Sequence, residues 1–101
     1  MIHVLATITA KPGRRAELLD AFRAVLPQVH AEEGCLQYLP AIDTDHPISN
    51  ASIGADSYVV IETWTTREAL AAHAATPHMA AFAARSKDLI ANRVLHVLES
   101  A

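Results

Sequence analysis

The segment between Tyr58 and Phe82 constrains the fold of this 101-residue chain more than any other part of the sequence. Its first part belongs to the run from Ser57 to Thr65, which is rich in β-branched and aromatic residues and predicts a strand. Alternate side chains of a strand point to opposite faces, so one face carries Tyr58, Val60, Glu62 and Trp64, and the other carries Val59, Ile61 and Thr63. Both faces are mostly apolar, which indicates a central strand covered on both sides.

Two helix-start signals follow this strand. Thr65-x-x-Glu68 has the spacing of a capping box, in which a hydroxyl and a carboxylate bond reciprocally to backbone N–H groups. In Thr76-Pro77, threonine is a good N-cap and proline suits the first helical position. We therefore expect a helix over about 67–75 and another over about 77–90. The inward side chains of the second helix are expected to be Met79, Phe82, Ala83, Ser86 and Leu89.

The first half of the chain has the same order of elements. Ile2 to Ala10 predicts a strand, which Lys11-Pro-Gly13 ends. From Arg14 to about Ala31, apolar residues recur at three- and four-residue steps, as on one face of a helix. Pro27 lacks the N–H of a helical bond and clashes with the preceding turn, so we expect a kink or break there. Gly34 is the expected C-terminal cap.

The remaining segments complete the predicted fold. Cys35 to Asp43 is expected to be an edge or bulged strand, because Pro40 cannot donate to a ladder. Thr44 to Asp56 is polar and turn-forming, and such a loop can cover a pocket or reach a partner subunit. Val94 to Leu98 predicts the last strand. The order indicates one domain, 1–101, with an α+β, ferredoxin-like βαββαβ sandwich whose antiparallel strands lie in the order 4-1-3-2.

The composition indicates that this sheet meets a second chain. Hydrophobic residues make up 51% of the sequence and charged residues 19%, which is more apolar side chain than a small core can hide. The helices of the predicted fold cover one face of the sheet only. We therefore expect a homodimer that packs sheet against sheet as a dimeric α+β barrel.

Several classes of function are excluded by what the sequence lacks. A net charge of −3 argues against nucleic-acid binding, and a single cysteine, Cys35, excludes an internal disulfide or a multi-cysteine metal site. No run of ~18 apolar residues predicts a membrane span, and no signal peptide is recognised, so a cytoplasmic location is expected. The six scattered histidines lack the spacing of a helical zinc site, so no metal is expected. No nucleotide-binding glycine motif occurs.

His73 and Glu62 are the residues best suited to acid–base chemistry. His73 falls on the inward side of its helix, which should fold back near Trp64. A partly buried imidazole beside a carboxylate can act as a general base, or it can be a core histidine with one hydrogen bond. Glu62 stands in an apolar strand, so its carboxylate is expected to pair with His73, Tyr38, an arginine or backbone amides, for structure or for chemistry. Trp64 can wall an aromatic ligand or belong to the core.

Three stretches of the sequence carry a family resemblance. They are Glu32-Glu-Gly-Cys-Leu-Gln-Tyr38, Tyr58-Val-Val-Ile-Glu-Thr-Trp64, and Ala72-His-Ala-Ala-Thr-Pro-His-Met79 followed by Phe82. Together they closely resemble the antibiotic biosynthesis monooxygenase (ABM) superfamily and, more narrowly, its quinol monooxygenase-like branch. The similarity spans almost the whole chain, including Lys11-Pro-Gly13 and Ala55-Asp-Ser57.

The resemblance implies a homodimer in which each subunit binds a small aromatic substrate between sheet and helices. It implies oxidation of a quinol or another aromatic hydroxy compound by O2, without metal, flavin or haem. In that setting His73 is expected to be the base. Glu62 is expected to orient the His73 ring or to favour its charged form. The substrate ring is expected to contact Trp64, Tyr38, Met79, Phe82 and His78.

Other activities within the same resemblance remain open. The chain can be a small-molecule-binding dimer without turnover, or an isomerase of a phosphorylated sugar-derived signal, although the inward faces offer few cations for phosphate. Haem degradation is disfavoured, because the position of the haem ligand falls near Ala83 and that of the family tryptophan near His73.

Overall fold

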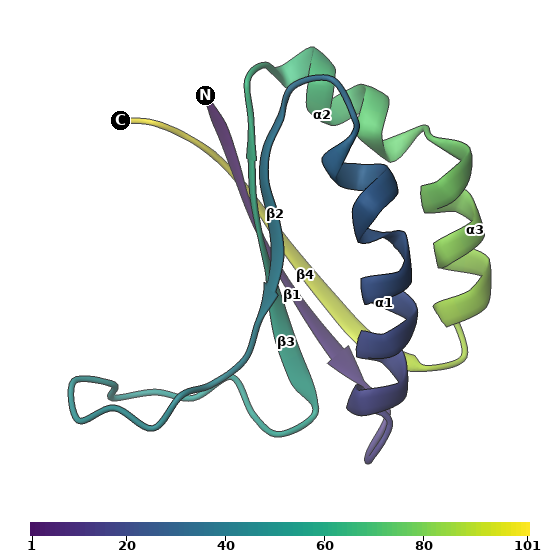
Figure 1. Cartoon of the computed structure of the whole chain (residues 1–101). Helices are drawn as coiled ribbons and strands as arrows, with labels where there is room; N and C mark the ends of the chain where they lie inside the picture. The colour runs from purple at the N-terminus through teal and green to yellow at the C-terminus, as the bar shows by residue number, and fades with distance from the viewer.

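The computed structural model describes residues 1–101 as a four-stranded sheet with three helices on one of its faces (Figure 1). The elements are β1 (Ile2–Ala10), α1 (Arg15–His30), β2 (Cys35–Ala41), β3 (Ser57–Trp64), α2 (Arg67–Ala74), α3 (Pro77–Ser86) and β4 (Ile90–Glu99). The strands lie in the order β2-β3-β1-β4, and every neighbouring pair is antiparallel. This is the predicted order 4-1-3-2 counted from the other edge, so the ferredoxin-like prediction is confirmed. No helix has both the length and the apolar character needed to cross a bilayer.

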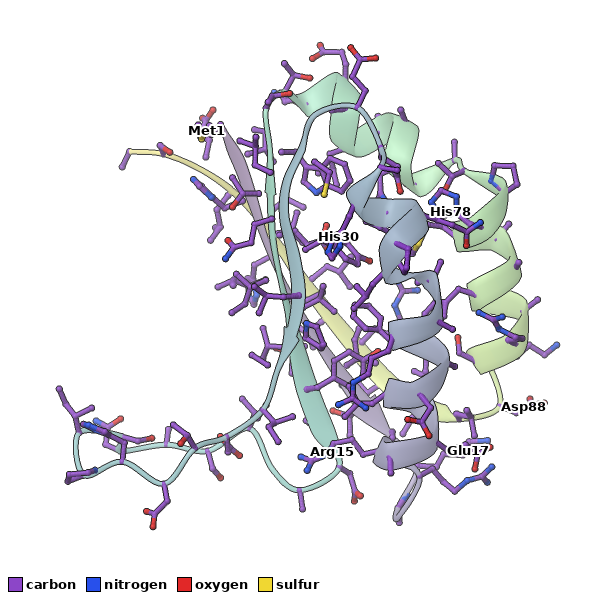
Figure 2. The ribbon with its side chains drawn as sticks, in the orientation of Figure 1. Met1, Arg15, Glu17, His30, His78 and Asp88 are labelled. Carbon is purple, nitrogen blue, oxygen red and sulfur yellow. The ribbon has the colours of Figure 1, made fainter.

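The core forms between the sheet and the helices, as the two sequence periodicities predict. Along β1 every second residue is buried, and α1 buries one stripe of its surface. The buried side chains of these two elements are Ile2, Val4, Ala6, Ile8, Ala10, Leu18, Leu19, Phe22, Val25 and Val29. Charged residues such as Glu17 and Asp88 point away from this core (Figure 2).

The opposite face of the sheet has no cover within one chain. Leu5 of β1 and Leu98 of β4 expose 40% and 46% of their surface, and Leu39 and Val94 are exposed on the same face. The expectation that the central strands are covered on both sides is therefore met on one side only. An apolar sheet face of this kind indicates a surface that meets another chain.

Pro27 does not break α1, which corrects the predicted break; a kink at this position stays a prediction. The helix continues through Pro27 to His30. Both Pro27 and Arg23 lie on the exposed side of α1, so the carbonyl that loses its helical partner can bond to water. Val25 and Val29, which flank the proline, are buried and hold this last turn against the sheet.

The cap assignments at two turns also need correction. The N-cap of α2 is Thr66, whose hydroxyl accepts a hydrogen bond from the Ala69 backbone N–H at 3.0 Å. The predicted cap, Thr65, instead uses its own N–H to bond to the Gly34 carbonyl at 2.9 Å, so it still belongs to the strand region. The C-cap of α1 is Ala31, and Gly34 lies in the turn that follows. At Thr76 and Pro77 the predicted start of α3 is confirmed.

The boundary between the last helix and the last strand falls earlier than predicted. α3 ends at Ser86 instead of about residue 90, and β4 begins at Ile90 instead of Val94. β2 is an edge strand, as Pro40 indicated, and ends at Ala41 instead of Asp43. The longer β4 pairs with the whole of β1. This pairing places Arg93 opposite Ile8 and thus on the helix side of the sheet.

The predicted loop over 44–56 is present, begins two residues earlier at residue 42, and extends away from the body of the protein (Figure 1). The Asp43 carboxylate closes its base by accepting hydrogen bonds from the backbone N–H groups of Ile53 and Gly54. At the far end Ile48 is 84% exposed. The role of this loop in reaching a partner subunit stays a prediction.

A substitution at Gly34 can test whether close packing of the turn between α1 and β2 against the start of α2 stabilises the fold. Its φ is +84°, and a Cβ at this position would lie 2.6 Å from the Ala69 Cβ and 2.7 Å from the Thr65 Oγ1. We expect Gly34→Ala to lower the free energy of unfolding by about 3 kcal/mol or more, because backbone strain and a steric clash add. Gly13→Ala is the matched control, since Gly13 has φ +77° and open space around it. Its cost should be only about 1–2 kcal/mol. Urea unfolding at one protein concentration measures both, and equal losses would contradict the packing argument.

Candidate active site

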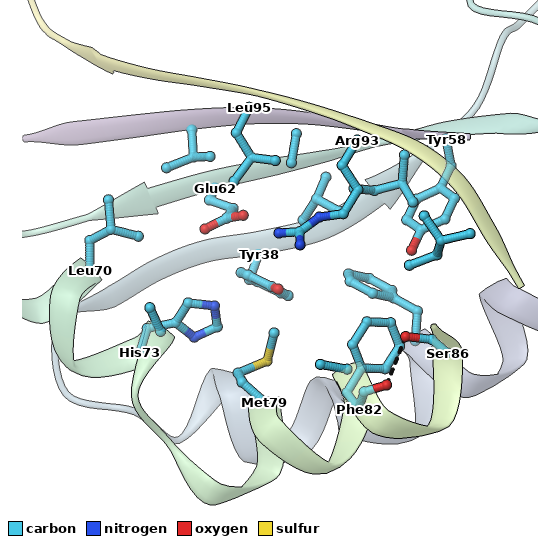
Figure 3. Close-up of a pocket in the computed structure, with 18 of the residues that line it drawn as sticks. Tyr38, Tyr58, Glu62, Leu70, His73, Met79, Phe82, Ser86, Arg93 and Leu95 are labelled. Atoms are coloured by element: carbon cyan, nitrogen blue, oxygen red, sulfur yellow. Dashed lines mark hydrogen bonds between the residues drawn. The ribbon is translucent and has the colours of Figure 1, made fainter. Parts of the chain in front are cut away.

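A cavity of about 690 Å³ lies between the sheet and the helices (Figure 3). Sixteen of its 21 lining residues are hydrophobic, so the cavity suits a mostly apolar ligand with a few polar groups. Three of the lining residues from β4 and two from α3 are exposed to solvent, which means that the cavity opens along these two elements. No residue of the 42–56 loop lines it, so the loop does not cover this pocket.

The cavity brings together most of the residues that the sequence singled out. Its lining includes five of the seven predicted site residues, namely Tyr38, Glu62, His73, Met79 and Phe82. The other two, Trp64 and His78, do not line it. Trp64 is fully buried behind the wall, and His78 lies at the start of α3 with its side chain close to the end of α1 (Figure 2).

His73 is held between two aromatic rings. α2 folds back over the sheet as predicted, and the His73 ring centroid lies 4.7 Å from Trp64 and 5.2 Å from Tyr38. The Nδ1 atom of His73 is 3.0 Å from the nearer carboxylate oxygen of Glu32. The other ring nitrogen, Nε2, has no hydrogen-bond partner in the protein. No solvent-inaccessible side-chain nitrogen or oxygen lacks a partner, so Nε2 must be accessible. It is therefore free to meet a ligand in the cavity.

Glu62 has a different partner from those that the sequence suggested. Its carboxylate accepts a hydrogen bond of 3.0 Å from the indole N–H of Trp64, two residues further along the same face of β3. Burial raises the pKa of Glu62, while the Trp64 N–H and the nearby His73 act in the opposite direction. The raised pKa means that this carboxyl group takes up a proton more readily than a carboxyl group in water.

Glu32 is the main site residue that the sequence interpretation missed. It follows α1 in the turn that leads to β2, and its side chain is only 11% exposed. Besides His73 it contacts His78, whose Nε2 is 2.7 Å from a Glu32 oxygen. In the sequence Glu32 begins one of the three stretches that carry the family resemblance, but it was assigned no role in the site. Nothing local distinguishes the acid that points inward from its exposed neighbour.

Two cations also line the cavity. Arg93 projects into it from β4 (Figure 3), and Lys87 follows α3. Neither forms an ion pair within the chain. Two cations among 21 lining residues are still few, but Arg93 was not among the predicted site residues, because β4 was predicted to begin after it. With β4 starting at Ile90, the alternation of Arg93, Leu95 and Val97 would have found it.

Two buried tyrosines complete the polar part of the wall. Burial raises the pKa of both Tyr38 and Tyr58, so their hydroxyl groups stay protonated and can donate hydrogen bonds. No group of three or more His, Cys, Asp or Glu side chains has an arrangement that could hold a metal ion.

Comparison with known proteins agrees with this architecture. Residues 1–85 match the family model described as antibiotic biosynthesis monooxygenase. The chain belongs to the antibiotic biosynthesis monooxygenase family. It is 37% identical over 101 residues to YgiN of Escherichia coli, named as a probable quinol monooxygenase, with 98% of this chain and 97% of YgiN covered. The relationship supports monooxygenase activity for this chain.

Two further relatives extend the comparison. YcnE of Bacillus subtilis is 30% identical over 90 residues, which cover 89% of this chain and 86% of YcnE. The crystal structure of PA3566 from Pseudomonas aeruginosa superposes with a TM-score of 0.83 at 30% identity, covering 99% of this chain and 93% of the other. The ABM fold thus extends over the full length of the chain.

Proposed function

We propose that this ABM protein oxidises a quinol or another aromatic hydroxy compound with O2, without a bound cofactor. The observation that carries the proposal is the unbonded Nε2 of His73 in an apolar cavity beside the buried carboxyl group of Glu62. An apolar cavity binds an aromatic ring by excluding water from it. A base in that cavity can then remove the proton of the ring hydroxyl group.

The chemistry needs only the substrate, O2 and a proton acceptor. Once deprotonated, an aromatic hydroxy compound is a good electron donor and can reduce O2 directly. For a quinol, loss of the two ring-hydroxyl hydrogens, with insertion of one oxygen atom into a ring C–H bond, gives a hydroxyquinone. The second oxygen atom leaves as water, so one O2 is consumed for each quinol and no external reductant is required.

Each residue of the cavity has a role in this scheme. His73 takes the hydroxyl proton through Nε2, and Glu62 contacts the substrate hydroxyl groups or shuttles the proton onward. Met79 and Phe82 form the apolar wall against the ring, and Tyr38 adds its ring face and a hydroxyl donor, because all three line the cavity. Trp64 supports both His73 and Glu62 from behind, by ring contact and hydrogen bond respectively. Arg93 offers a positive charge to the anion that forms.

We also propose that the protein works as a homodimer joined through the uncovered face of its sheet. The apolar side chains on that face support this assembly, because isolated monomers rarely leave such a surface in water. Among them are Leu5 and Leu98, which lie on the inner strand β1 and on the edge strand β4.

The test is oxygen uptake with menadiol as the quinol. The wild-type chain is expected to consume O2 faster than menadiol oxidises by itself, at a rate proportional to protein concentration. A ligand-dependent rise in melting temperature without added O2 uptake would instead support a binding protein without turnover.

A second candidate, the isomerase, is favoured by one observation. Arg93 and Lys87 give the cavity two unpaired cations that could hold a phosphate group. Conversion of a phosphorylated sugar derivative under anaerobic conditions would support that activity and would contradict the need for O2.

A further inference from the structure

Glu32 joins three segments of the chain through one carboxylate. Its oxygens lie 3.0 Å and 3.1 Å from Nδ1 of His73 on α2, and one of them lies 2.7 Å from Nε2 of His78 on α3. All three side chains are largely buried, with exposed fractions of 7%, 11% and 16% for His73, Glu32 and His78. A carboxylate in such a place requires strong hydrogen bonds.

The contact determines which nitrogen of His73 carries the proton. An ionised carboxylate can only accept hydrogen bonds, so the His73 nitrogen that faces it must be Nδ1–H. In the neutral ring the other nitrogen, Nε2, is then an acceptor with a free lone pair. That nitrogen has no partner in the protein and belongs to the residue that lines the cavity.

The orientation of the ring is restrained as well as its tautomer. Trp64 and Tyr38 contact the His73 ring, which limits its rotation. His78 restrains Glu32 from a second direction, because its Nε2–H occupies the carboxylate oxygen nearer to it. Gly34, two residues after Glu32, lets this turn approach the start of α2 closely. The Glu32 carboxylate is thus linked through the His73 imidazole to the cavity.

We propose that Glu32 is a positioning residue that holds His73 as the Nδ1–H tautomer with Nε2 directed to the substrate, and that His78 holds Glu32. This proposal deepens the function proposed above and rests on it. Glu62, which the sequence suggested for this role, bonds to Trp64 instead and is left to face the substrate. Glu32 itself does not line the cavity, so it acts on the reaction only through His73.

The direct test is spectroscopic and needs no turnover. In ¹H–¹⁵N correlation spectra of the histidine rings, with His73 assigned by its absence in His73→Ala, the neutral wild-type ring is expected to show a protonated Nδ1 and an unprotonated Nε2. A wild-type His73 with its proton on Nε2 would overturn the proposal, whatever the activity of the protein.

The variant Glu32→Gln adds a kinetic test. Gln keeps the size of Glu but has no charge, and whichever way its amide lies, an NH2 donor replaces an oxygen that lies within 3.1 Å of His73 Nδ1. We expect the Nε2–H tautomer to become populated and kcat for menadiol oxidation to fall by roughly 10²-fold with little change in KM. Glu33→Gln is the matched control, because Glu33 is the exposed neighbour and makes no side-chain hydrogen bond. It should leave both the spectrum and kcat unchanged.

The outcomes separate this proposal from the proposed function. An unchanged tautomer and unchanged kcat in Glu32→Gln would overturn the positioning role. If the wild-type chain consumes no O2, the proposed function fails. In that case the tautomer of Glu32→Gln still decides the positioning role: a shift to Nε2–H supports it, and a retained Nδ1–H overturns it.

Discussion

Replacing His73 by alanine is expected to lower kcat/KM for menadiol oxidation by roughly 10²–10⁴-fold, the usual contribution of a general base. The variant removes the only imidazole that lines the cavity. It leaves the apolar walls in place, so substrate binding should change less than kcat. The measurement is initial O2 uptake over a range of menadiol concentrations, corrected for oxidation without protein.

The control for this variant has to separate chemistry from folding. His73 is buried, so its truncation should also lower the melting temperature, but His78 still holds Glu32. The assay therefore runs well below the melting temperature, with circular dichroism to verify that the fold is retained. His46→Ala, in the exposed loop, changes a histidine far from the cavity and should keep the wild-type rate. A folded His73→Ala variant with the wild-type rate would remove His73 from the mechanism.

The parts of the fold that the sequence predicted well are those with local causes. Alternating apolar residues indicate β1 and β3, and Thr76-Pro77 specifies the start of α3 by its own cap. The strand order followed from the order of the elements, since few topologies accommodate two β-α-β units in about 100 residues. The dimer that would cover the open face of the sheet remains a prediction.

Errors arose where two local signals competed or where tertiary packing decided. Thr65 and Thr66 are both good caps, and the hydrogen bond between Thr65 and Gly34 across the sheet edge selects Thr66. A kink or break was expected at Pro27, and α1 does not break there because the buried valines beside it outweigh the missing hydrogen bond. The end of α3 was missed because helix and strand patterns overlap after Ser86.

In the site, too, the features with local causes were predictable and those that depend on tertiary packing were not. His73 was placed near Trp64 correctly because α2 is short and directly follows β3. The bond between Glu62 and Trp64 joins residues i and i+2 of one strand, so it could have been predicted from the strand alone. The contact between Glu32 and His73 spans 41 residues. Only the folded chain brings the turn after α1 to α2.

The central claim is that the cavity between sheet and helices houses the oxidation, and Ala83 gives the most direct test of it. Ala83 lines the cavity from α3, whereas the adjacent Ala84 does not, and both are exposed. A tryptophan at either position costs α3 only about 0.5 kcal/mol in helix propensity. At position 83 its ring would enter the cavity and displace the substrate ring from the base.

Oxygen uptake with menadiol is the measurement, with Ala83→Trp and Ala84→Trp compared at equal concentration. We expect Ala84→Trp to keep the wild-type rate and Ala83→Trp to lose roughly 10²-fold in kcat/KM, because a small displacement of the substrate from the base is enough to cause such a loss. If Ala83→Trp folds and oxidises menadiol at the wild-type rate, the reaction does not take place in this cavity.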